Sequence, residues 1–187
     1  MANDCWNRVV LKGDESKLKN ILKKIESQEN GIFNYENYNT LFDSDVSDIQ
    51  GDEWGSKRFT PYATIEDGEL IITGDSAWTP MIGLFETICA EWELDGELTY
   101  EESGYDFAGR ICWDTNGVIT EHTEWTYWEK MFLFDKENFY EEAGFRMEVS
   151  DSFDEFMEGL SILRWIEKPE LDMDKLNEMW NNCHDEL

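Results

Sequence analysis

Carboxylates and two histidines are the side chains whose types and spacing could support chemistry in this sequence. The segment Asp43-Ser-Asp45-Val-Ser-Asp48 has the acidic spacing that opens a calcium-binding loop. The glycine expected at the sixth position is Asp48, however, and Trp54 stands where the bidentate glutamate should be. Non-specific loop acidity therefore explains this segment better than a calcium site.

The histidines, His122 and His184, lack partners for metal binding or nucleophilic catalysis. Cys183-His184 has no second pair at zinc-finger spacing. A phosphate-binding loop and a nucleophile elbow are also absent from the sequence. Carboxylates that are distant in the sequence could still come together in the fold as the site of a metal-dependent nuclease. Such an enzyme must attract DNA, however, and the net charge of −28 opposes this. We therefore predict a protein that is not an enzyme, with no catalytic residue, metal site or cofactor.

The net charge is −28, from 43 acidic and 15 basic side chains. Typical small domains carry a net charge of magnitude about 2 to 8, and self-repulsion at this level works against the compact state. The charge also repels nucleic acids and anionic membranes, which excludes both as direct partners. The expected partner is a protein with a basic, nucleic-acid-binding surface, and the oligomeric state is left open.

The composition indicates a folded protein, because hydrophobic residues make up 41% and aromatic residues 14% of the chain. No apolar run is long enough to cross a membrane, and the first residues lack the pattern of a signal peptide. We therefore expect a cytoplasmic protein. In that compartment scattered cysteines are expected to be buried free thiols, and the sequence has Cys5, Cys89, Cys112 and Cys183.

The acidic residues are distributed unevenly along the chain. Residues 1–30 hold five acids and six bases, whereas residues 86–106 hold eight acids and no base. The candidate partner-binding residues in this second stretch are Glu86, Glu91, Glu93, Asp95, Glu97, Glu101, Glu102 and Asp106. Those of the stretch before it are Asp43, Asp45, Asp48, Asp52, Glu53 and the neighbouring Trp54.

Regular strands and helices hold carboxylates at fixed spacings, so the acids of residues 86–106 could imitate part of the charge array of duplex DNA. The alternative interpretation is a solvated acidic exterior without a specific role. Trp54 is equally open to two interpretations: an exposed interface anchor or a buried plug of its loop.

Hydrophobic periodicity predicts the elements that must position these residues. Expected strands span residues 6–11, 57–65, 69–73, 97–101, 106–113 and 118–127, and expected helices span 15–27 and 78–92. The order β-α-β-β-α-β predicts an α+β ferredoxin-like fold, and Asn116-Gly117 adds an antiparallel hairpin. Residues 28–55 form a long acidic loop of the kind that is often functional or mobile.

The chain changes character after residue 130. Residues 131–134 and 139–145 are apolar and aromatic without a clear period, and helices are expected at 152–166 and 172–182. We therefore predict a ferredoxin-like domain over residues 1–130 and an aromatic-rich helical extension, packed on it, over residues 131–187.

Three segments of the sequence form recognisable motifs: Asn3-Asp4-Cys5-Trp6-Asn7-Arg8-Val9, Asp75-Ser76-Ala77-Trp78-Thr79-Pro80 and Tyr105-Asp106-Phe107-Ala108-Gly109. In this order they resemble the signatures of the YubB-like proteins carried by phages and plasmids. The resemblance implies a ferredoxin-like domain and a mobile-element origin, without a catalytic site. Met81 replaces the second proline of the family signature, and Trp78, Pro80 and Gly109 are expected to determine the fold rather than bind a partner.

The leading hypothesis is an acidic phage or plasmid protein that binds and inhibits a host nucleic-acid-binding defence protein by imitating DNA. Restriction or CRISPR proteins would be natural targets in the setting that the resemblance implies. The alternative is a non-enzymatic accessory module that binds a partner through its aromatic surface. A carboxylate metal-dependent enzyme is the third hypothesis.

Overall fold

The computed structural model describes residues 4–43, 51–102, 104, 107–162 and 171–184. The chain forms two compact units, which we call unit 1 (Met1–Glu124) and unit 2 (Trp125–Leu187). Each unit has its own hydrophobic core. The division falls after Glu124, so the boundary that we expected after residue 130 lies inside a helix of unit 2. Packing of the tail on the sheet stays a prediction.

Unit 1 contains the elements of a ferredoxin-like fold. They are β1 (Asp4–Lys12), α1 (Glu15–Glu26), β3 (Arg58–Glu66), β4 (Glu69–Ala77), α2 (Ile82–Trp92) and β5 (Asp95–Glu102). Three further strands, β2 (Phe33–Asn34), β6 (Phe107–Trp113) and β7 (Ile119–Trp125), extend the sheet on both sides. Its order is β2-β3-β4-β1-β5-β6-β7, with antiparallel pairing from β2 to β6. The predicted fold is confirmed.

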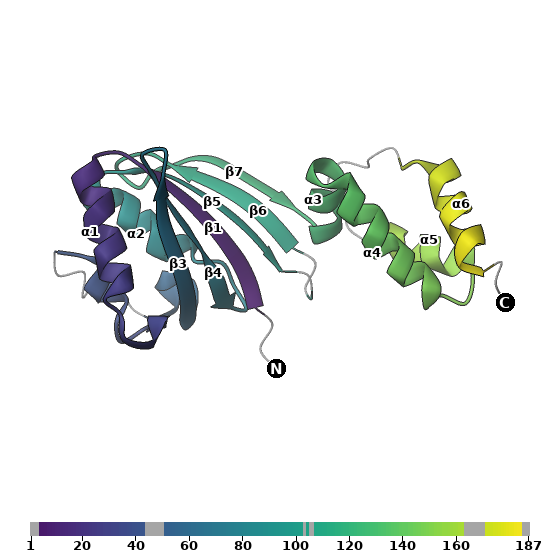
Figure 1. The fold of residues 1–187 in the computed structure, drawn as a ribbon, viewed down its shortest axis with the longest axis horizontal. Coiled ribbons are helices and arrows are strands. Elements are labelled where there is room, and N and C mark those ends of the chain that lie inside the picture. The colour runs from purple at the N-terminus through teal and green to yellow at the C-terminus, as the bar shows by residue number, and fades with distance from the viewer. Residues whose placement is uncertain (1–3, 44–50, 103, 105–106, 163–170, 185–187) are drawn as a thin grey trace. The chain divides into compact units, whose positions relative to one another are not determined.

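Helices α1 and α2 cover one face of this sheet (Figure 1). On β1 the side chains of Cys5, Asn7, Val9 and Leu11 are fully buried toward the helices. Successive strand residues point to opposite faces, so Arg8 and its even-numbered neighbours lie on the other face, which we call the open face. The N-terminus of α1 is capped by Asp14, whose carboxylate accepts hydrogen bonds from the backbone of Ser16 and Lys17.

The segment from residue 28 to residue 55 is more ordered than we expected. Its described parts contain short 3-10 helices at Glu29–Gly31, Tyr38–Leu41 and Gly51–Trp54, besides strand β2. The aromatic side chains of Phe33, Tyr38, Phe42 and Trp54 are all buried in the core of unit 1. A buried aromatic ring removes about 150–250 Å² from water. The prediction of one long loop was therefore wrong for these parts, because the aromatic residues pack them into the core.

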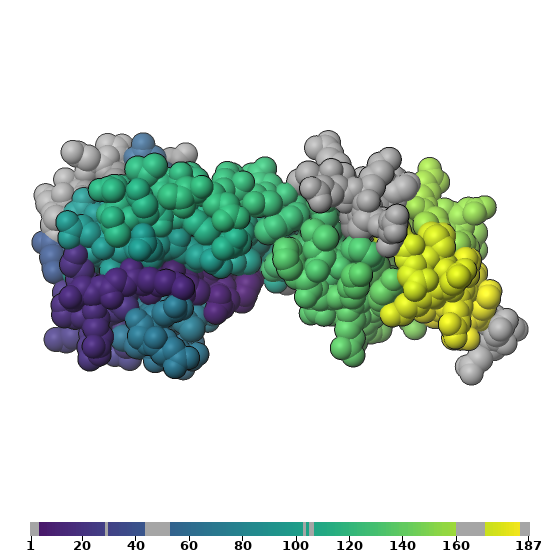
Figure 2. All heavy atoms as spheres, turned by 90° about the horizontal axis from the view of Figure 1, so that it is seen from above, coloured from purple at the N-terminus to yellow at the C-terminus, as the bar shows by residue number. Residues whose placement is uncertain are grey.

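Unit 2 is built from four described helices around an aromatic core. They are α3 (Tyr127–Phe134), α4 (Lys136–Glu148), α5 (Phe153–Ile162) and α6 (Met173–His184). Thr126 and Glu129 form a capping box that begins α3 and ends β7 earlier than predicted. Helix α6 packs against α4 (Figure 2). The Lys175 ammonium of α6 lies 3.5 Å from the ring centre of Tyr140 on α4. No helix within the described ranges is long and apolar enough to cross a membrane.

Candidate partner-binding surface

The predicted acids around helix α2 are exposed. Glu86 and Glu91 are exposed on α2, and Glu53 is exposed on the segment whose backbone packs against Gly83 of the same helix. We call Glu53, Glu86 and Glu91 the α2-side acids. Glu93 follows α2 in a left-handed conformation, with φ of 51°. Its carboxylate lies 2.6 Å from the Lys17 ammonium, and this hydrogen bond lowers the pKa of Glu93.

Strand β5 separates its acids between two faces. Leu98 is fully buried toward the helices, so Glu97 and Glu101 lie on the open face and Glu102 faces the opposite way. Glu102 is only 3% exposed, and its carboxylate accepts a hydrogen bond of 3.0 Å from the backbone of Gly104. The prediction that Glu102 belongs to an exposed binding surface was therefore wrong, because the pleat of the strand turns its side chain inward.

Arg110 of β6 joins three strands on the open face. Its guanidinium lies 2.8 Å from Glu97 of β5 and 2.9 Å from Glu121 of β7. The hydrogen bond from Arg110 lowers the pKa of Glu97 below its ordinary value of 4.5. A lowered folded-state pKa contributes stability above the unfolded pKa, and this contribution is lost as the pH falls through the folded pKa.

This linkage predicts how an Arg110→Met variant behaves. The variant keeps much of the apolar stem but loses the charge, so we expect it to lower the free energy of unfolding by about 1 kcal/mol at pH 7. The difference from wild type should shrink as the pH falls below about 4. Urea unfolding at pH 7, 5 and 3.5 measures it. A difference that is the same at all three values would show that Arg110 acts by packing alone.

The acids before Trp54 are only partly described. Asp43 is exposed, lies 3.0 Å from the Lys24 ammonium and accepts a hydrogen bond from Asn20. Asp45, Asp48 and Asp106 lie outside the described residues, as does the side chain of Asp52. Asp95 is exposed at the first position of β5, opposite Lys12 of β1.

Trp54 is buried, with only 3% of its surface exposed. Its ring lies 5.7 Å from the Tyr38 ring and is stacked on Phe42 at 5.8 Å, measured between ring centres. Of the two interpretations, the buried plug is therefore correct. The prediction of Trp54 as a partner-binding anchor was wrong, because its neighbouring aromatic rings draw it into the core.

Most basic side chains of unit 1 form ion pairs with acids of the same unit. The ion pairs among the described residues include Lys12–Glu69, Lys17–Glu93, Lys19–Glu15, Lys24–Asp43, Arg58–Asp4 and the two of Arg110. The α2-side acids and the open-face acids belong to opposite layers of the unit. The acidic residues from Glu86 onward therefore do not share one face.

Metal and thiol chemistry find little support in the described part of the chain. Within those residues no group of three His, Cys, Asp or Glu side chains is placed to hold a metal ion. The four cysteines are free, with Cys5 and Cys89 buried and the other two partly exposed. Burial raises the pKa of Cys5 and Cys89 to about 12, so these thiols stay protonated at neutral pH.

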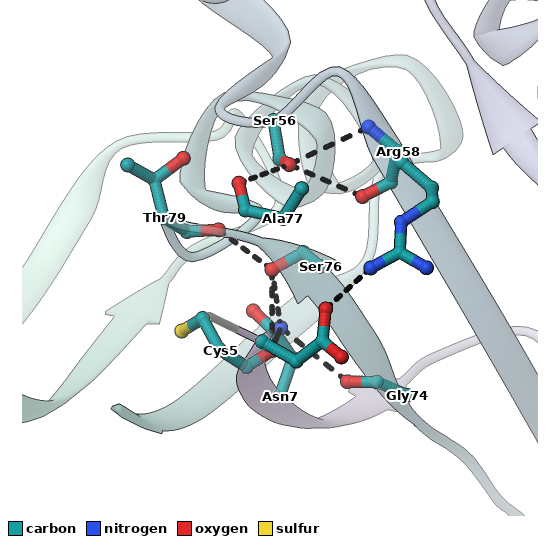
Figure 3. A network of polar contacts seen from close by, with 9 residues as sticks. Cys5, Asn7, Ser56, Arg58, Gly74, Ser76, Ala77 and Thr79 are labelled. Atoms are coloured by element: carbon teal, nitrogen blue, oxygen red, sulfur yellow. Dashed lines mark hydrogen bonds and ion pairs between the residues drawn. The ribbon is translucent and has the colours of Figure 1, made fainter. Parts of the chain in front are cut away.

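A buried polar network joins two of the segments that carried the family resemblance (Figure 3). The Asn7 amide nitrogen donates to the Cys5 carbonyl and to the Ser76 hydroxyl, both at 2.8 Å. Its carbonyl oxygen accepts a hydrogen bond of 3.0 Å from the backbone of Met81, at the start of α2. Ser76 donates in turn to the Thr79 carbonyl at 2.6 Å. These segments determine the fold, and periodicity could not reveal that they meet.

Trp78 lies between the anchored residues of this network. Its φ is +75°, which is rare for a bulky residue, and 37% of its surface is exposed. The hydroxyl of Ser56 donates to the Ala77 carbonyl at 2.8 Å, and Thr79 donates to the Gly55 carbonyl. Bonds on both sides thus hold the Trp78 backbone in this conformation. Helix α2 begins at Ile82, after Pro80, rather than at Trp78 as predicted.

The third resembling segment also has a packing role where it is described. A Cβ atom on Gly109 would lie 2.2 Å from the Tyr100 hydroxyl oxygen on the neighbouring strand. Tyr100 is 4% exposed, so its ring could not easily move away. Gly109 therefore permits the close packing of Tyr100 on β6, a role in the fold.

The sheet order, the antiparallel pairing and two helices on one face define an α+β protein with a ferredoxin-like fold. Residues 57–157 match the family described as the ferredoxin-like domain in Api92-like protein. Because this match spans more than half of the 187 residues, the chain belongs to that family. The matched span begins next to β3 and ends in α5, so it leaves β1 and α1 outside. Searches of curated proteins and of solved structures gave no match.

Proposed function

We propose that this chain is a non-catalytic protein that binds and inhibits a host nucleic-acid-binding protein by occupying its basic surface. It would act in the host cytoplasm, and its origin would be a phage or plasmid, as the similarity to the YubB-like proteins suggests. Defence proteins that bind nucleic acids are the class of target that this origin favours. The family match gives the fold, and the negative charge of the chain supports a partner with a basic surface.

The observation that carries the proposal is the exposure of the α2-side acids in a unit whose bases are mostly paired. Residues 59–109 contain no lysine or arginine. Glu86 and Glu91 are exposed within this span, and Glu53 is exposed on the segment that packs against α2. The α2-side acids are therefore the candidate surface for attracting a basic partner, since opposite charges steer encounter and fix its register.

A charge-matched comparison tests this location. One variant carries Glu53→Gln, Glu86→Gln and Glu91→Gln, and its control carries Glu66→Gln, Asp67→Asn and Asp75→Asn, so both lose three negative charges. The control residues are exposed on β3, β4 and their turn. We expect the first variant to bind at least tenfold more weakly than the control, and wild-type binding to weaken steeply with salt.

The measurement uses a partner captured by the full chain from host lysate, followed by competition between this protein and labelled DNA. Loss of DNA binding by the partner as this protein is added supports the proposal. Unchanged DNA binding at saturating concentrations of this protein would refute inhibition by occupancy. Equal weakening by the two variants would refute the α2-side location, since net charge alone would then explain binding.

An accessory module that binds through apolar and aromatic side chains is the second candidate. The observation that favours it is the exposure of large apolar side chains in unit 2, where Phe145 is 56% and Val149 is 83% exposed. Trp54 cannot test this candidate because it is buried. The residues that can test this candidate are instead the exposed apolar side chains of unit 2, Phe145 and Val149.

A further inference from the structure

Unit 2 has a groove between the end of α4 and the middle of α5. It encloses about 260 Å³ and is lined by Arg146, Val149, Ser150, Glu155, Phe156 and Gly159. Phe156 is 3% exposed and belongs to the core of the unit. A Cβ atom on Gly159 would meet nothing within 4 Å, so the glycine leaves open space in the wall. The groove is therefore wide enough for an apolar side chain from outside.

The rim of the groove is apolar on its α4 side. Val149 follows α4, and Phe145 lies one helical turn before it, so their side chains lie on neighbouring positions of one helix face. Exposed apolar side chains that adjoin a groove commonly mark an interaction surface. The turn to α5 is held in place, because the Glu155 carboxylate accepts a hydrogen bond of 2.9 Å from Asp151 and the Ser152 hydroxyl accepts one of 3.1 Å from Glu155.

The charge around the groove identifies the kind of partner. Glu148, Asp151, Asp154, Glu155 and Glu158 are all exposed on α4, α5 and the turn between them. Among the described lining residues the cationic side chain is Arg146, which holds its guanidinium over the Trp128 ring at 4.5 Å. An apolar groove between helices that carry exposed acids is complementary to an apolar segment flanked by lysine or arginine. A second copy of this chain, at −28, would be repelled.

We infer that this groove docks a basic amphipathic segment of the partner protein, with an apolar side chain inserted beside Phe156 and Gly159. The inference rests on the proposed function and deepens it, because it gives the basic partner an apolar point of attachment besides the α2-side acids. Amphipathic helices laid into apolar grooves are a recurring mode of recognition.

The test uses the full chain and two synthetic helical peptides with the same leucine positions, one with lysine and one with glutamate on the polar face. We expect the leucine–lysine peptide to bind and the leucine–glutamate peptide not to bind, as measured by calorimetry. Gly159→Leu should weaken the binding at least tenfold by filling the groove. Its control, Asn181→Leu, adds the same side chain at an exposed position of α6 and should leave the binding unchanged.

Val149→Ser provides a second variant that does not depend on how Gly159→Leu folds, because Val149 is largely exposed. It should weaken peptide binding several-fold. Equal peptide affinity in wild type, Gly159→Leu and Val149→Ser would overturn the inference by showing that charge alone attracts the peptide, and no binding to wild type would also overturn it. The α2-side triple variant should still bind the peptide, so failure of the groove and failure of the proposed function are separable.

Discussion

Replacement of Asn7 by alanine is expected to lower the free energy of unfolding of unit 1 by about 3–5 kcal/mol. The side chain is fully buried and makes hydrogen bonds to Cys5, Ser76 and the backbone of Met81. Truncation removes three buried hydrogen bonds, each worth about 0.5–1.5 kcal/mol, and takes away the acceptor of the Met81 N–H, and a buried unsatisfied group costs about 1–3 kcal/mol. Since domains are stable by about 5–15 kcal/mol, this one amide accounts for a large share of the stability. Urea unfolding, followed by circular dichroism, measures the change.

An exposed asparagine provides the control for this substitution. Asn39 is exposed on the short helix Tyr38–Leu41, so Asn39→Ala should change the free energy of unfolding by no more than about 0.5 kcal/mol. A cost below about 1 kcal/mol for Asn7→Ala would mean that water replaces the lost amide at no great expense. That result would contradict the role of the network in holding the start of α2.

The Asn7 network shows where sequence reasoning succeeds and where it fails. Helix α1 was predicted to within one residue at each end and strand β1 to within two, because hydrophobic patterns are local signals and Asp14 is a local cap. The hydrogen bond from Asn7 to Met81 joins residues far apart in the chain. No periodic pattern reports such a contact, although the resemblance had already singled out both segments.

The candidate binding surface was harder to predict than the fold. The sequence predicted that carboxylates would lie on regular elements, and β5 and α2 do carry them. It could not show that Glu102 turns inward or that Arg110 binds Glu97, because both depend on the strand register. Burial of Trp54 was equally hidden, since it depends on rings from a different part of the same long segment.

Helices α3 and α4 were not predicted because their sequences lack a single apolar face. Their aromatic residues occupy several faces, as in the adjacent pair Phe139 and Tyr140, which are both buried. A helix that buries more than one face loses the simple apolar stripe on which pattern reading depends. The capping box at Thr126 and Glu129 was the sequence signal that could have located the start of α3.

Alanine substitutions at Gly83 and Gly159 are expected to change the free energy of unfolding in opposite directions. The comparison tests how the segment around Trp54 packs on α2. In a helix interior alanine is favoured over glycine by about 1 kcal/mol. Gly159→Ala should gain this amount, because its Cβ would enter open space. At Gly83 the Cβ would lie 1.7 Å from the Glu53 carbonyl oxygen and 2.9 Å from its carbon. Backbone must therefore move, and we expect Gly83→Ala to cost about 3 kcal/mol.

The fluorescence of Trp54 should report this displacement, since the Glu53 backbone that must yield is adjacent to the buried indole. A red shift of the emission in Gly83→Ala, with loss of stability, indicates that the segment has left the core. The same red shift in Gly159→Ala would point to a general loosening instead. Stabilisation by both substitutions would show that the Glu53 segment packs loosely on α2. The exposed Glu53 would then lack the fixed position that the α2-side surface requires.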